Sequence, residues 1–241
     1  MKLVNQFLPL LLLCITSFTM QAQSTKSKVQ LLSPKQQSLI TISSYTAQGN
    51  LAKLKPALYT GLDAGVTVNE IRESLVHLYA YCGFPRSLRG IMTLMEVLKE
   101  REAKGIKDKA GAEASPLKDD RGKYVRGKET LEELTGVKET DPKTGYAAFA
   151  PEIEVFLKEH LFADIFERDV LTYQERELVT ISVLSSIGGV EPMLRSHLGI
   201  CLNVGITAGQ LGEFMAIIKT TATKEDATSA EVALNEVLKQ K

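Results

Sequence analysis

Residues 32–43, LSPKQQSLITIS, and residues 171–182, LTYQERELVTIS, are two copies of one pattern in this 241-residue chain. In both copies a Ser or Thr is followed three residues later by Gln or Glu, which is the capping box that begins a helix. The copies align again, after a one-residue shift, at Gly65-Val66-Thr67 and Gly205-Ile206-Thr207. Each of these glycines stands where a helix needs a left-handed C-terminal cap. The repeat therefore predicts a helix, a short turn, a second helix, a Gly-x-Thr turn and a third helix in each copy.

Both copies carry apolar residues at helical spacing, and alternating strand patterns are absent, so an all-α fold is expected. In the first copy Pro85 is expected to open a further helix that runs to about Lys99. Residues 131–136 are expected to form a short helix, and residues 151–166 an amphipathic helix that leads into the second copy. The expected boundaries are 1–22 for a signal peptide, 23–100 for the first repeat, 101–150 for a linker with a short helix, and 151–241 for the second repeat.

The first residues of the chain have the pattern of a secretory signal. Lys2 supplies the positive region, an apolar run extends from Phe7 to Phe18, and Ala22 offers a small residue before a cleavage point. The apolar run is too short for a membrane span. Cys14 is not preceded by the small residue typical of lipoproteins, so lipidation is not expected. The sequence predicts a periplasmic or secreted protein that keeps no membrane contact after cleavage.

Composition excludes several classes of partner. The 29 basic and 29 acidic residues give a formal net charge of zero, so no overall field attracts nucleic acid or an anionic membrane. The chain also has no Trp with which to stack bases. Cys82 and Cys201 lack metal-ligand spacing and are interpreted as small buried residues, although a disulfide between them stays open. Neither a metal nor a cofactor is expected.

Several motifs resemble those of a known family. The first copy has Gly65-Val66-Thr67-x-x-Glu70-Ile71-x-Glu73 and then Tyr81-Cys82-Gly83-Phe84-Pro85, and the second has Arg176-Glu177-Leu178 and then His197, eight residues before Gly205. These motifs are similar to the signatures of the carboxymuconolactone decarboxylase family, which includes the alkyl hydroperoxidase D-like proteins. The resemblance implies helical units that assemble into trimers or hexamers. For a two-copy chain we expect a homotrimer, with a dimer as the alternative.

The resemblance also narrows the chemistry. The peroxidase branch uses a Cys-x-x-Cys-x-x-x-His motif, because peroxide reduction needs a pair of thiols. Counting back from His197, the two cysteine positions hold Val190 and Met193, so a thiol peroxidase is not expected. The decarboxylase branch needs no cysteine, because its chemistry is proton transfer with stabilisation of developing negative charge.

The candidate site lies in the second copy. His197 is predicted to transfer the proton, Glu177 to orient it or relay the proton, and Arg195 to bind the carboxylate of a small cyclic or unsaturated organic acid. Glu177 shares a helical line with apolar residues, which predicts a buried carboxylate. At the matching places the first copy has Ser38 and Ala57, which cannot perform this chemistry.

A second hypothesis is a non-catalytic, oligomeric binding or assembly protein that keeps the fold. It predicts that side chains such as Met193 and Cys201 close the surroundings of His197. Among the remaining polar residues, Glu73 and Glu213 are expected to pair the two repeats, and Arg86 has the reach to bind an anion. His77 is expected at the surface or an interface, and His160 in solvent.

Overall fold

The computed structural model describes residues 31–240, and in this range all the regular secondary structure is helical, with no β-strand. The expected all-α fold built from two repeats is confirmed. The predicted signal peptide and the start of the first repeat lie outside the described residues. No described helix combines the length and the apolar character needed to cross a bilayer.

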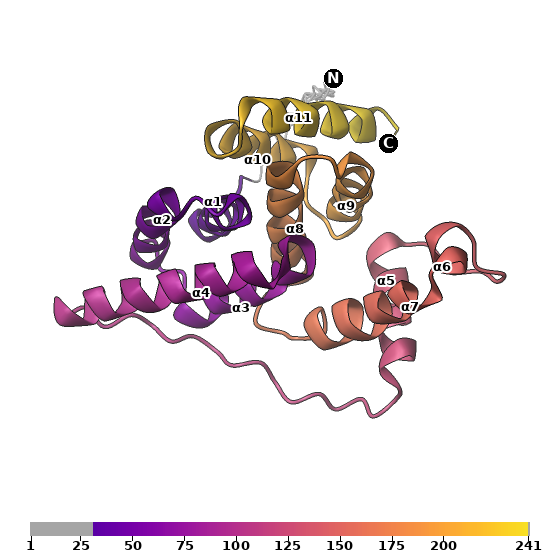
Figure 1. Cartoon of the computed structure of the whole chain (residues 1–241), viewed down its shortest axis with the longest axis horizontal. Coiled ribbons are helices and arrows are strands. Elements are labelled where there is room, and N and C mark those ends of the chain that lie inside the picture. The colour runs from indigo at the N-terminus through magenta and orange to yellow at the C-terminus, as the bar shows by residue number, and fades with distance from the viewer. Residues whose placement is uncertain (1–30, 241) are drawn as a thin grey trace, which may run out of the picture.

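Each repeat contributes four helices, and a third group of helices lies between them in sequence (Figure 1). The first repeat consists of α1 (Pro34–Gln48), α2 (Leu51–Asp63), α3 (Val68–His77) and α4 (Tyr79–Ala103). The second consists of α8 (Tyr173–Ile187), α9 (Glu191–Asn203), α10 (Ala208–Thr221) and α11 (Lys224–Lys239). Between them come α5 (Lys123–Thr135), α6 (Gly145–Phe149), α7 (Pro151–Phe156) and the π-helix η1 (Leu157–Ile165).

The helix boundaries follow the local signals in the sequence. The two predicted capping boxes form at Ser33 and Thr172, and Thr67 and Thr207 of the Gly-x-Thr turns form two more. The two Gly-x-Thr turns contain glycines with φ of 88° and 92°, a region that residues with a Cβ rarely adopt. The helix that Pro85 was expected to open is the long part of α4, which follows a kink at Gly83 and ends at Ala103.

Helix α8 is the centre of the fold, because both repeats pack against it. Every residue from Glu175 to Ser186 is buried. One side of α8 belongs to the apolar core of the second repeat, and another side belongs to the core of the first. Helix α1 lies along α8, where Ser44 Oγ is 2.8 Å from Ser186 Oγ and donates to Thr221 Oγ1 at 2.9 Å. The two repeats therefore share one interior.

Reciprocal contacts from glutamates of α3 and α10 join the repeats. Glu73 of α3 accepts hydrogen bonds from Arg168 and Arg176 of the second repeat. Glu213, at the matching place in α10, accepts a hydrogen bond of 2.9 Å from the backbone N–H of Leu32, just before α1. Both contacts cross between the repeats, as predicted for these two residues.

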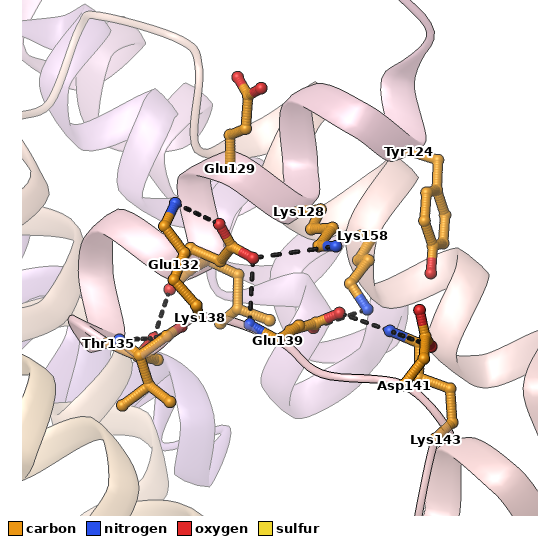
Figure 2. A network of polar contacts seen from close by, with 12 residues as sticks. Tyr124, Lys128, Glu129, Glu132, Thr135, Lys138, Glu139, Asp141, Lys143 and Lys158 are labelled. Atoms are coloured by element: carbon orange, nitrogen blue, oxygen red, sulfur yellow. Dashed lines mark hydrogen bonds and ion pairs between the residues drawn. The ribbon is translucent and has the colours of Figure 1, made fainter.

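The segment between the repeats forms a helical unit of its own (Figure 1). Helix α5 packs closely on η1, since a Cβ at Gly127 would meet the backbone oxygen of Lys158 at 1.9 Å. Figure 2 shows the polar network around them, in which Lys158 lies 2.7 Å from Glu139. Lys158 is buried and also pairs with Glu154. The short helix predicted at 131–136 is the end of the longer α5, and the helix predicted at 151–166 consists of α7 and η1.

Two rows of large apolar side chains remain exposed at the surface. The row on α4 occupies successive turns, and each member is at least 50% exposed: Phe84, Leu88, Met92 and Met95. The row on α6 and α7 is similarly exposed: Tyr146, Phe149, Ile153 and Phe156. Large apolar patches of this kind usually mark interfaces. Because the two rows differ, the row on α4 of one copy could pack against the row on α6 and α7 of the next copy. Such a heterologous contact closes into a ring under cyclic symmetry.

We therefore expect the chain to form a homotrimer at micromolar concentration, with a dimer as the alternative. The double variant Leu88→Glu, Met92→Glu places charges in the α4 row, so it is expected to yield monomers in light scattering. Leu117→Glu, at an exposed residue of the linker, serves as the control and should keep the wild-type mass. A wild-type chain that stays monomeric at this concentration would contradict the expectation.

Candidate proton-transfer site

The structure brings His197 and Glu177 together. His197 on α9 places Nδ1 2.8 Å from Oε2 of Glu177 on α8. The Glu177 side chain is 0% exposed and that of His197 is 13% exposed, so the pair is buried except for part of the imidazole. Because the carboxylate oxygen accepts this hydrogen bond, Nδ1 carries the proton and Nε2 keeps its lone pair when the ring is neutral. Oε1 of Glu177 has no hydrogen-bond partner among residues 31–240.

Neutral groups surround this pair. The ring of Tyr81 meets that of His197 edge-on, with centroids 5.6 Å apart. Burial, and then the charge of Glu177, raise the pKa of Tyr81 and the pKa of Cys201 well above their ordinary values. Burial also raises the pKa of Cys82 to about 11. Both cysteines are free thiols, and these shifts keep them protonated at neutral pH, which is unfavourable for thiolate chemistry.

A buried ionic cluster lies next to the pair, at the junction of the repeats. The carboxylate of Glu73 contacts Arg168 Nε at 2.9 Å and Arg176 Nη2 at 2.8 Å. Burial alone would raise the pKa of Glu73, but the hydrogen bonds and charges of the two arginines outweigh it, and the pKa is lowered. Glu73 therefore stays ionised between the two guanidinium groups.

His77 contacts both Arg176 of this ionic cluster and the ring of Tyr81. Its Nδ1 is 3.3 Å from Nη1 of Arg176, and its Nε2 is 2.9 Å from Oγ1 of Thr180. Arginine only donates, so Nδ1 accepts and Nε2 carries the proton that is donated to Thr180. The His77 ring also lies 5.4 Å from the ring of Tyr81. Burial, followed by the charges of Arg176 and His197, lowers the pKa of His77 well below its ordinary value.

Of the two positions expected for His77, the surface is wrong, because the residue is fully buried at the interface between the repeats. A signal for this was present in the sequence. Glu73, His77 and Tyr81 are spaced four residues apart, which places them on one line of a helix. In the structure that line faces α8. His160, in contrast, is about half exposed, as expected.

Arg195 does not join the pair. It lies two residues before His197 on α9, so the two side chains point about 160° apart around the helix. Its Nη1 contacts Glu236 Oε2 of α11 at 3.2 Å instead. The binding of a substrate carboxylate by Arg195 stays a prediction. Met193, expected to help close the surroundings of His197, is 56% exposed, whereas Cys201 is fully buried.

The matching place in the first repeat is hollow. A pocket of about 500 Å³ between α1 and α2 is lined by Ser38 and Ala57, the counterparts of Glu177 and His197. Gly61 of α2, at the position of Cys201, also lacks a side chain that would fill it. The hydrogen-bonded Glu177 and His197 thus lie in the second repeat, and their counterparts in the first repeat are Ser38 and Ala57.

Comparisons with known proteins identify the family and support the fold. The family model described as the carboxymuconolactone decarboxylase family matches residues 18–93 and 151–236. A 4-carboxymuconolactone decarboxylase of Acinetobacter baylyi is 31% identical over 97 residues, which are 40% of this chain and 72% of that protein. The crystal structure of a putative gamma-carboxymuconolactone decarboxylase subunit from Burkholderia xenovorans LB400 superposes with a TM-score of 0.50. It has 23% identity, covers 87% of this chain and 80% of its own, and supports the fold alone.

The buried, neutral His77 predicts a stability that depends on pH. A histidine whose folded pKa lies below its unfolded value stabilises the fold above the unfolded value, about 6.5, and loses this contribution as the pH falls. The free energy of unfolding should therefore fall below pH 6.5, by up to about 1.4 kcal/mol per pH unit from this group. Glu73, with its lowered pKa, contributes above the unfolded value of about 4.3 and loses its contribution at more acidic pH.

Chemical denaturation between pH 7 and pH 5 measures the effect. His77→Gln keeps a donor for Thr180 but does not titrate, so its unfolding free energy should vary less over this range. His160→Gln, at an exposed histidine, is the control and should keep the wild-type slope. Equal slopes in the wild type and in His77→Gln would contradict the assignment.

Proposed function

Because this chain belongs to the carboxymuconolactone decarboxylase family, we propose that it is an exported carboxymuconolactone decarboxylase-like enzyme. Its substrate is a small cyclic or unsaturated organic acid, and its chemistry is proton transfer. The observation that carries the proposal is the 2.8 Å hydrogen bond between His197 and the fully buried Glu177. The pattern of residues 2–22, typical of a secretory signal, supports export to the periplasm or the medium.

Decarboxylation of such an acid breaks the bond between a carbon and its carboxylate, and carbon dioxide leaves. The electron pair stays on the carbon, where conjugation with a neighbouring carbonyl delocalises it, and the carbon then takes a proton. An imidazole suits this step, because its pKa allows it to give and take protons near neutral pH. Nε2 of His197 is the atom that meets the substrate in this proposal.

Glu177 acts through the imidazole. Its hydrogen bond to Nδ1 fixes the orientation and the tautomer of the ring. Its carboxylate also stabilises the imidazolium that forms when Nε2 holds a proton, the role that a buried carboxylate has in other acid–base pairs. Tyr81 closes one side of the imidazole with its ring and excludes water there.

A non-catalytic binding protein is the second candidate. The observation in its favour is the small exposure of His197, since 13% of the side chain is a narrow access for a substrate. The two candidates differ in one result. An enzyme turns over an acid that it binds, whereas a binding protein retains that acid unchanged.

Replacement of His197 tests the proposal. The mature protein is incubated with 4-carboxymuconolactone and a panel of small unsaturated acids in D₂O, and NMR follows loss of substrate and deuterium incorporation at carbon. His197→Ala should lower kcat by roughly 100-fold or more, the usual contribution of a general acid or base. Glu177→Gln should lower kcat by a comparable factor, since an amide that donates to Nδ1 leaves the imidazole in the wrong tautomer.

Ser196→Ala, at an exposed neighbour on α9, is the matched control and should keep the wild-type rate. Full turnover by His197→Ala would overturn the role of this residue. Binding of an acid with no turnover by the wild type would favour the binding protein instead.

A further inference from the structure

A second hollow lies beside Tyr81, at the junction of the two repeats. It has a volume of about 630 Å³ and is formed where α1 ends, α2 and α4 begin, α8 ends and α11 begins. Its lining includes side chains of both repeats, among them Gln48, Asn50, Tyr81, Arg86 and Thr223. None of its lining residues is an Asp or a Glu.

The side chain of Arg86 lines this hollow and is exposed to solvent. Its guanidinium lies over Gly49, the residue that ends α1 with φ of 68°, a conformation that favours glycine. The guanidinium is therefore accessible to a ligand that enters from solvent.

Arg86 has no charged partner in the described part of the chain. No hydrogen bond or ion pair joins its guanidinium to another residue between 31 and 240, whereas the buried Arg101 and Arg176 are both paired with carboxylates. The amide of Asn50 accepts from the N–H of Lys53 through Oδ1, which leaves its Nδ2 free to donate. A guanidinium without a charged partner and a free amide donor thus line the same hollow, which has no acidic group in its lining.

From this arrangement we propose that the hollow binds the carboxylate of a small organic acid through Arg86. The planar guanidinium matches a carboxylate with two parallel hydrogen bonds. Asn50 Nδ2 supplies a further donor, and the ring of Tyr81 with Ile187 supplies an apolar wall for the carbon skeleton. This site is separate from the one predicted at Arg195, whose guanidinium pairs with Glu236.

The hollow and the acid–base pair share Tyr81. The same ring that lines the hollow lies edge-on against His197, with centroids 5.6 Å apart. Tyr81 thus contacts both the hollow and the imidazole, so an acid bound at Arg86 is expected to shift the NMR resonances of the His197 ring. The identification of this acid with the substrate rests on the proposed function, whereas binding of a carboxylate at Arg86 does not.

Calorimetric titration of the mature protein with cis,cis-muconate tests the site. The wild type should bind muconate, and it should not bind the uncharged dimethyl ester. Arg86→Gln should weaken binding at least tenfold, and Arg86→Lys, which keeps the charge but not the paired donors, should fall in between. Arg89→Gln, one turn further along the exposed side of α4, is the matched control and should change the Kd less than twofold. Thermal melting establishes that each variant is folded.

The outcomes separate the two proposals. Muconate binding that survives His197→Ala and shifts the His197 imidazole resonances of the wild type supports the site, whether or not muconate is turned over. Equal loss of binding in Arg86→Gln and Arg89→Gln would overturn the assignment of Arg86. Inorganic phosphate that binds at least as tightly as muconate would overturn the assignment of a carboxylate ligand.

Discussion

The carboxylate of Glu73, buried between two arginines, is the contact on which the junction of the repeats depends. Loss of one partner from such a buried ionic cluster typically costs about 3–5 kcal/mol, because it leaves an uncompensated charge. One of the arginines, Arg176, also donates to His77 and so fixes its tautomer. His77 lies against Tyr81, which in turn lies against His197. A continuous set of contacts thus connects the junction of the repeats with the candidate proton-transfer pair.

The two repeats use one helical frame for different purposes. In the second repeat Glu177 and His197 fill the space between α8 and α9, and in the first repeat Ser38 and Ala57 leave a hollow of about 500 Å³ between α1 and α2. The first repeat contributes to the site from outside, because Tyr81 forms one wall of it. Both repeats therefore contribute to the surroundings of the pair, although Glu177 and His197 themselves come from the second.

The sequence predicts the parts of this structure that depend on local interactions. Capping boxes and glycine turns involve residues a few positions apart, so the helix starts at Ser33 and Thr172 could be located from sequence alone. The pairing of Glu177 with His197 could be predicted from the family resemblance. The burial of His77 was not predicted, because it depends on which face of α3 meets α8. The pairing of Arg195 with α11 and the packing of α5 on η1 also depend on distant segments, which no local pattern specifies.

The protonation of the His197 imidazole tests the central claim most directly, since proton transfer through Nε2 requires Glu177 to hold the proton on Nδ1. Nitrogen-15 NMR of the imidazole ring distinguishes the two neutral tautomers. We predict that the neutral ring of the wild type carries its proton on Nδ1. In Glu177→Gln, where an amide can donate to Nδ1, the proton should move to Nε2. A wild-type ring that is neutral with its proton on Nε2 would contradict this account of the site.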